Sequence, residues 1–89
     1  MAGKLNKKEE LIGVVVHYYG KAGVAVIKFN RDISKKEEVC FRGPSTDFSQ
    51  KIDSIQRDHK DIEMAPKNKE VGVKVKERVR EGDEVYKTL

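Results

Sequence analysis

The sequence predicts one all-β domain, a closed antiparallel barrel of six strands with a Greek-key-like order. Valines, isoleucines and aromatic residues gather in six short blocks, and glycine, proline, asparagine or aspartate residues separate the blocks. None of the blocks carries a convincing helical repeat. The chain length of 89 residues suits one domain with one modest core. Short strands at this spacing favour a closed or sandwiched antiparallel architecture.

The first two blocks predict a β-hairpin. Residues 11–19 are rich in β-branched and aromatic side chains, Gly20-Lys21 predicts a turn, and residues 23–29 form the second strand. Because side chains alternate along a strand, Lys28 should point outward and its neighbours inward.

The middle of the chain predicts two further strands around a loop. Residues 39–42 form the third strand, and Gly43–Asp47 is expected to be a loop because proline cannot donate to a ladder. Residues 48–56 form the fourth strand, with a β-bulge near Asp53-Ser54 that restores the inward phase. A helix over residues 48–56 is the rival interpretation, since its apolar residues also fit a helical stripe.

The last third predicts the remaining two strands. Residues 57–68 are charged and irregular, residues 70–76 alternate strictly, and residues 84–87 form the final strand. Residues 1–10 are expected to be a flexible basic lead-in to a barrel that spans residues 11–89. The residues predicted to be buried are Val15, Ala25, Ile27, Phe29, Val39, Phe41, Phe48, Ile52, Val71, Val73 and Val85.

The cysteine content and the hydropathy pattern indicate the cellular compartment of the protein. Cys40 is the only cysteine, which excludes an intramolecular disulfide and a multi-cysteine zinc site. A small secreted domain would normally carry several disulfides, so a reducing compartment is favoured. No apolar run approaches the roughly 18 residues that cross a bilayer, and the first eight residues lack the hydrophobic segment of a signal peptide. We therefore expect a cytoplasmic protein without a membrane partner.

The sequence contains no pattern typical of catalysis. A phosphate-binding Gly-x-x-x-x-Gly-Lys-Ser/Thr motif is absent, which argues against a bound nucleotide cofactor. Cys40 could act as a thiol nucleophile with His17 or His59, but no third group is in place to orient them. The acidic residues around His59 match no metal-binding spacing and are typical of a solvated turn. We expect neither enzymatic activity, nor a cofactor, nor a metal.

Three motifs resemble the second domain of the translational GTPases, such as elongation factor Tu and initiation factor 2. They are Gly13–Val15 in the opening strand, Ala65–Gly72 at a turn and Arg80–Val85 in the closing element. The resemblance implies a barrel of the translation-factor domain 2 type. Asn68 stands where the family's turn has glycine, and asparagine tolerates the left-handed conformation, so we expect a positive φ there.

A closer resemblance is to stand-alone translation elongation factor-like proteins and to barrels appended to some collagenase-like peptidases. It rests on His17-Tyr18 followed by Gly23–Val26, on Thr46–Gln50, and on Val79–Lys87. The family usually has Val-Gly-Asp before its third strand. This chain has Lys-Glu-Glu at residues 36–38, so we expect that turn to be rebuilt or longer.

The resemblance implies a non-catalytic binding module related to translation factors that contacts RNA, either the acceptor end of a tRNA or ribosomal RNA. The net charge of +4 permits such binding, and aromatic faces beside basic groups can stack a base and hold its phosphate. The candidate RNA-binding residues are His17, Tyr18 and Tyr19 for stacking, and Lys21, Lys28, Arg42, Lys51, Arg57 and Lys60 for phosphates. The alternative is a protein-interaction module that docks onto a partner enzyme such as a collagenase-like peptidase. RNA binding would weaken steeply with salt, whereas apolar docking would not.

Overall fold

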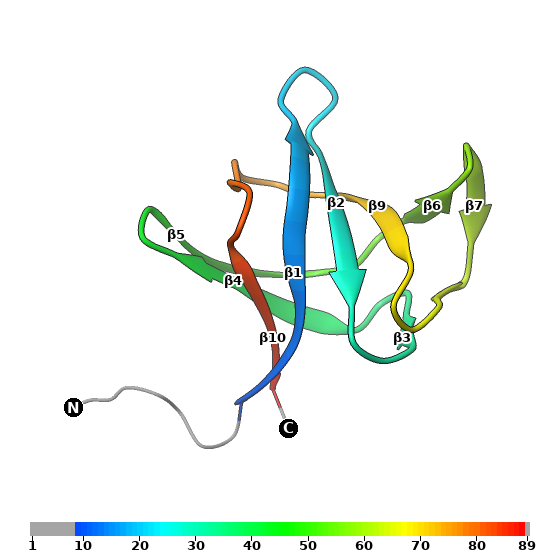
Figure 1. The fold of residues 1–89 in the computed structure, drawn as a ribbon, viewed down its shortest axis with the longest axis horizontal. Helices are drawn as coiled ribbons and strands as arrows, with labels where there is room; N and C mark the ends of the chain where they lie inside the picture. The colour runs from blue at the N-terminus through cyan, green and yellow to red at the C-terminus, as the bar shows by residue number, and fades with distance from the viewer. Residues whose placement is uncertain (1–8, 89) are drawn as a thin grey trace.

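The computed structural model describes residues 9–88, and these residues are all-β with no helix (Figure 1). The strands are β1 (Glu9–Tyr19), β2 (Val24–Phe29), β3 (Ile33–Ser34), β4 (Glu38–Gly43), β5 (Thr46–Lys51), β6 (Ile55–Arg57), β7 (Lys60–Ile62), β8 (Met64–Ala65), β9 (Glu70–Lys74) and β10 (Glu84–Thr88). Eight of them form one antiparallel sheet in the order β5-β4-β10-β1-β2-β9-β6-β7, and β3 pairs with β8 separately. The predicted all-β class is confirmed.

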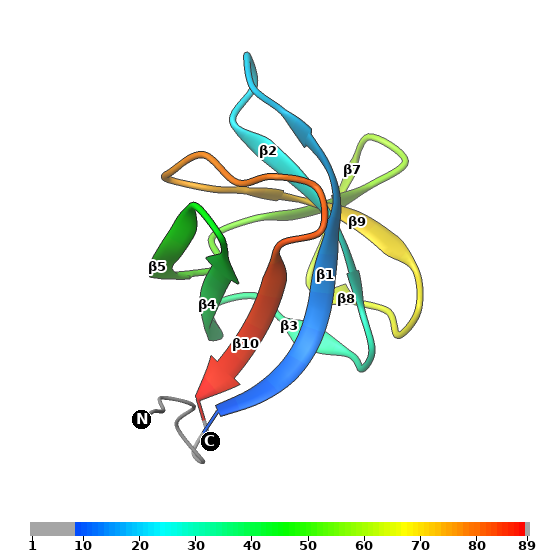
Figure 2. The same ribbon diagram turned by 60° about the vertical axis from the view of Figure 1, so that its left-hand side comes forward.

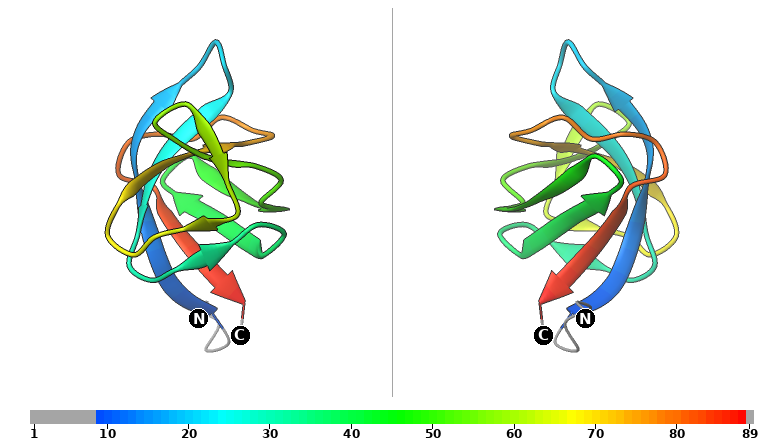
Figure 3. Two further views of the ribbon diagram at one scale, coloured as in Figure 1. Left: turned by 90° about the vertical axis from the view of Figure 1, so that its right-hand side faces the viewer. Right: turned by 90° about the vertical axis from the view of Figure 1, so that its left-hand side faces the viewer.

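The predicted closed barrel of six strands is wrong in both closure and strand number. The eight-stranded sheet curls around one interior, as Figures 2 and 3 show, but its outermost strands β5 and β7 do not pair within residues 9–88. The cause lies in the predicted fourth strand, which is neither continuous nor helical. β5 ends at Lys51, and Ile52 is bonded to the turn before β4: the Ile52 N–H donates to the Glu37 carbonyl (3.0 Å) and the Lys36 N–H to the Ile52 carbonyl (2.7 Å). The chain then rejoins the sheet as β6 beside β9, so the expected bulge is instead a break between two strands.

A side-chain amide bridges the open seam between β5 and the end of β9. The Gln50 Nε2 donates to the Lys74 carbonyl (2.9 Å), and the Lys76 N–H donates to the Gln50 Oε1 (2.8 Å). One glutamine therefore makes both bonds that a peptide group of a neighbouring strand would make. These two bonds link β5 to the end of β9 where no strand-to-strand ladder joins them.

The core matches the predicted one except at one position. Ten of the eleven predicted residues are buried, but Phe48 is half-buried and stacks on Phe41, with ring centroids 5.0 Å apart. Its strand lies at the sheet's edge, so only one side of the ring is covered. The structure adds buried residues that the prediction left out, namely Ile12, Ile33, Ile55, Ala65, Val75 and Val79.

Two connections are shorter or more regular than predicted. The loop after β4 is only Pro44-Ser45, since Gly43 pairs with Thr46. The expected irregular stretch at residues 57–68 contains the β6–β7 hairpin and β8, and its two-residue turn places Asp58 and His59 at φ 55° and 65°. Such hairpin turns usually take Asn-Gly or Asp-Gly, so the Asp-His pair here did not indicate a turn.

The positive φ predicted for Asn68 is confirmed at 64°. The Lys-Glu-Glu turn survives as a tight turn in which Lys36 itself takes a φ of 75°. β1 begins at Glu9, two residues inside the predicted lead-in, whose residues 1–8 lie outside the described part of the chain. None of the described residues forms a helix of the length and apolarity that crossing a membrane would need.

Candidate functional site

An exposed apolar patch lies on β1, and we call Leu11 and Val14 the β1 patch. Their exposed fractions are 43% and 37%, and they border a hollow of about 220 Å³ with Gly13, Gly82 and Glu84. A register shift between Leu11 and Gly13 makes β1 depart from simple alternation. Ile12 and Gly13 therefore both face inward, and the two apolar side chains on either side of them are left in solvent.

Gly13 is required at this point because β1 crosses β2 closely. A Cβ there would lie 2.9 Å from the Lys28 carbonyl oxygen and 3.0 Å from the Phe29 ring. Backbone and a buried ring cannot give way cheaply, so a side chain would push β1 outward. The glycine thus allows the β1 backbone to lie close to β2 between the two apolar side chains.

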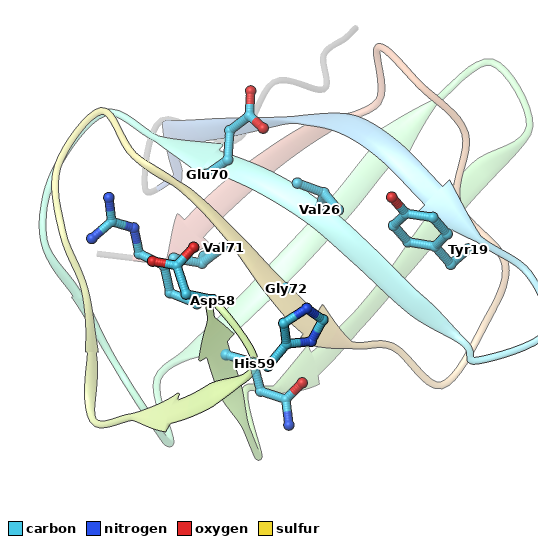
Figure 4. Close-up of a pocket in the computed structure, with 9 residues that line it drawn as sticks. Tyr19, Val26, Asp58, His59, Glu70, Val71 and Gly72 are labelled. Carbon is cyan, nitrogen blue, oxygen red and sulfur yellow. The ribbon is translucent and has the colours of Figure 1, made fainter.

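A second, larger hollow crosses the outer face of β2, β9 and β6, and we call it the Gly72 groove (Figure 4). Gly72 pairs with Val26 on one side and Gln56 on the other, so the middle of the groove has no side chain. Its volume is about 540 Å³. The lining residues are Tyr19, Val26, Gln56, Arg57, Asp58, His59, Glu70, Val71 and Gly72.

Arg42 is held in an ion pair and does not present a free cationic site. Its guanidinium makes two bonds to the Glu9 carboxylate (2.7 and 2.8 Å) and lies 3.3 Å from an oxygen of Asp47. The bond to Glu9, the larger cause, raises the pKa of Arg42. The Glu9 side chain is only 7% exposed and the Arg42 side chain 38%, so the carboxylate is withdrawn from solvent while the guanidinium remains partly exposed.

Cys40 packs beside this pair as a buried free thiol on β4. Burial, followed by the nearby Glu9 carboxylate, raises the pKa of the Cys40 thiol. Because the thiolate is the nucleophile, this environment works against reactivity. Within residues 9–88, no three histidine, cysteine or acidic side chains lie close enough together to hold a metal ion.

The remaining predicted site residues do not form one surface. Tyr18 packs against the core, whereas His17 and Tyr19 are exposed with their ring centroids 4.4 Å apart. Lys21 lies in the β1–β2 turn and Lys28 on the outer face of β2. Lys51 lies on β5 at one end of the sheet, and Arg57 and Lys60 lie on β6 and β7 at the other.

One juxtaposition in the predicted set joins residues that are far apart in the sequence. Tyr19 and Arg57 both line the Gly72 groove, although 38 positions separate them in the chain. Sequence reasoning missed Leu11, Val14 and Gly72. The first two are exposed by a register shift that leaves no local pattern, while the Val-Gly-Val alternation of β9 did carry a signal, a glycine on the outward phase.

Comparisons with known proteins find similarity to protease and collagenase proteins and to a peptidase domain. No protein-family model matches the chain. It is 41% identical over 86 residues to an uncharacterized protease of Methanocaldococcus jannaschii. The aligned residues make up 96% of this chain and 21% of that protein. A collagenase of Porphyromonas gingivalis is 26% identical over 83 residues, 91% of this chain and 23% of that protein.

The comparison with solved structures also finds a peptidase domain. The crystal structure of the C-terminal domain of a putative U32 peptidase from Geobacillus thermoleovorans matches with a TM-score of 0.82 and 27% identity. The match covers 88% of this chain and 99% of that one. The chain is homologous to the C-terminal domain of U32 peptidases. It spans about a fifth of the length of the curated relatives it matches.

The expected translation-related role and RNA binding are wrong. The relatives are protease and collagenase proteins and a U32 peptidase domain, which bear out only the part of the resemblance that concerned barrels appended to collagenase-like peptidases. The motifs behind the translation-factor resemblance serve backbone geometry, such as the positive φ of Gly82 (91°) and Asn68 (64°). Such turns report a fold and do not specify a ligand.

Proposed function

We propose that this chain is a non-catalytic docking module that binds a U32-type peptidase. One observation carries the proposal. The chain matches nearly all of an isolated peptidase C-terminal domain, but only about a fifth of the curated protease and collagenase relatives. The part of those relatives outside the match is where we place their catalytic groups. The buried, high-pKa Cys40 and the ion-paired Arg42 support a role without chemistry of its own.

The β1 patch is the proposed contact surface. Exposed apolar side chains that lie together beside a hollow are typical of a surface that contacts another protein. In a C-terminal domain the first strand is the element closest in sequence to the rest of the protein, and the patch lies on β1. The occupant we propose is an apolar surface of the peptidase remainder.

Isothermal titration calorimetry can test this proposal. The partner is the M. jannaschii relative lacking the segment that matches this chain. We expect binding whose dissociation constant changes little between low and high salt, because few ions are released on apolar contact. Leu11→Lys should weaken binding by about tenfold or more, since burying a lysine at an apolar anchor is unfavourable.

Met64→Lys is the matched control, because Met64 is also a large exposed hydrophobic residue (49%) but lies on β8, outside the patch. It should leave the affinity within about twofold of wild type, as expected for a residue outside the contact. Absence of binding by the unmutated chain would overturn the proposed function. Equal losses of affinity for the Leu11→Lys and Met64→Lys variants would show that the β1 patch is not the contact surface.

A further inference from the structure

A third hollow lies at the open seam of the sheet, between β5 and the end of β9, and we call it the seam hollow. Its volume is about 390 Å³, and it shares no residue with the β1 patch or the Gly72 groove. The residues that line it are Gln50, Lys51, Asp53, Lys74, Val75 and Lys76. Three lysines against one aspartate give this lining an excess of positive charge.

The backbone that carries two of these lysines is held from both sides. The Gln50 amide donates to the Lys74 carbonyl and accepts from the Lys76 N–H. Between them, the Val75 N–H donates to the Gly23 carbonyl (2.9 Å). Val75 is buried, whereas Lys74 and Lys76 are exposed, and two residues of an extended chain reach at most about 7 Å. Two lysine side chains therefore leave a fixed backbone close together, on either side of a buried apolar residue.

The lysines of the seam hollow are not neutralised within the described part of the chain. Lys51, Lys74 and Lys76 form no ion pair with any acidic side chain of residues 9–88, and Asp53 forms none with a basic one. Unpaired ammonium groups gathered at one hollow create a positive potential that attracts an anionic ligand.

We propose that the seam hollow binds an acidic segment of a partner protein, whose glutamate or aspartate carboxylates pair with Lys51, Lys74 and Lys76. Each ammonium group has three donors, and its hydrogen bonds to a carboxylate are charge-assisted. The methylene groups of a glutamate can lie along the apolar stems of the lysines. The hollow is not part of the β1 patch, so this contact is independent of the proposed docking to a peptidase.

The lining favours a peptide over a nucleic acid. It includes no aromatic ring on which a base could stack, and such stacking is a main source of affinity for single-stranded nucleic acid. Asp53 lies in the same hollow and repels a chain that carries a phosphate at every unit. A peptide can place carboxylates beside the lysines and a neutral residue beside Asp53.

The test is an NMR titration of the intact chain with N-acetyl-hexaglutamate amide, with N-acetyl-hexaglutamine amide as the uncharged comparison probe. At about 0.1 M salt, hexaglutamate should shift the backbone amide signals of Lys51, Val75 and Lys76, with a dissociation constant in the millimolar range expected for a few exposed ion pairs. The affinity should fall at least about threefold at about 1 M salt, where charges are screened within about 3 Å. Hexaglutamine should leave the signals in place.

Two charge-reversal variants separate the hollow from the net charge of the chain. Lys76→Glu should weaken hexaglutamate binding about tenfold, because it replaces an attraction with a repulsion. Lys69→Glu is the matched control, since Lys69 is exposed before the other end of β9 and does not line the hollow. Five residues of strand, roughly 16 Å, separate Lys69 from Lys74, more than the Debye length of about 10 Å at 0.1 M salt. Lys69→Glu should therefore change the affinity by less than about twofold.

Lys76→Gln keeps the test valid if Lys76→Glu lowers the melting temperature strongly. It removes one charge without adding another, so it should weaken hexaglutamate binding by about two- to fivefold.

The inference is overturned if hexaglutamate shifts none of these signals, or if hexaglutamine binds equally well. Equal losses for Lys76→Glu and Lys69→Glu would also overturn it, because binding would then follow net charge alone. Tighter binding of hexauridylate than of hexaglutamate would mark the hollow as a nucleic-acid site instead. None of these outcomes depends on Leu11 or Val14, so failure here and failure of the peptidase-docking proposal can be told apart.

Discussion

Replacing Gln50 should loosen the seam of the open sheet. The side chain is half-buried, and its amide makes two bonds to the backbone on either side of Val75 and a third, longer one (3.2 Å) to the Lys51 carbonyl. A hydrogen bond contributes about 0.5–1.5 kcal/mol net, so loss of the two shorter bonds in Gln50→Ala should cost about 1–3 kcal/mol. For a domain of this size that lowers the melting temperature by roughly 4–20 °C.

Gln50→Glu provides a pH-dependent version of the same test. At neutral pH its carboxylate can still accept from the Lys76 N–H but cannot donate to the Lys74 carbonyl. Protonation below about pH 4 restores a donor, so the difference from wild type should shrink in acid. Gln56→Ala is the control, because the Gln56 amide bonds only to an exposed Asp61 side chain (3.1 Å), and it should cost less than about 0.5 kcal/mol.

Thermal or urea unfolding followed by circular dichroism measures all these variants. Equal stabilities for Gln50→Ala and Gln56→Ala would refute the reasoning, since the seam would then be held by packing alone.

Four further predictions concern stability and use the same unfolding assay. Phe41→Ala should cost about 3–5 kcal/mol, because the ring is fully buried, and a smaller loss than about 1 kcal/mol would contradict the described core. Lys36→Gly should stabilise by about 0.5–1 kcal/mol by relieving a left-handed residue, and destabilisation would argue against the φ of 75°. Gly43→Ala should cost about 2–3 kcal/mol, because its Cβ would lie 2.0 Å from a carboxylate oxygen of Asp83, and the penalty should shrink in an Asp83→Ala background. Burial alone would raise the pKa of Glu37, but bonds from the Ser34 amide and Lys87 outweigh burial and lower this pKa. The ionised Glu37 carboxylate should therefore stabilise the folded state fully above about pH 5, and this contribution should disappear as the pH falls through the pKa of Glu37 in the folded state. The advantage of wild type over Glu37→Gln should vanish in parallel, and a pH-independent difference would rule out this linkage.

The sequence predicted the strands whose residues alternate strictly and whose ends carry turn residues. Residues 70–76 alternate strictly and contain β9, and residues 23–29, which follow a glycine turn, contain β2. The sequence pattern did not predict which strands pair with one another. Phe48, Ile52 and Ile55 could be read as one strand, because a local pattern does not show that Ile52 bonds to Glu37 while Ile55 pairs with Val73. A strand of two residues, such as β3, is too short to show the alternation of apolar and polar side chains that predicts a strand.

The candidate surfaces were less accessible to prediction than the core. Tyr19 and Arg57 were singled out for their chemistry, but their meeting depends on β2 and β9 lying between them. Leu11 and Val14 belong to a strand of which only Val15 was predicted to be buried. The register shift between Leu11 and Gly13 lies in the pairing of β1 with β10, which the local sequence does not show.

Methyl NMR spectra of the chain, recorded with and without the truncated M. jannaschii relative, test the docking proposal most directly. The exposed methyl groups of Leu11 and Val14 report on the β1 patch, and that of Met64 reports on a distant apolar residue. The account predicts that the Leu11 and Val14 signals shift or broaden on addition of the partner while the Met64 signal stays in place. Unchanged Leu11 and Val14 signals at saturating partner, or a change confined to Met64, would contradict it.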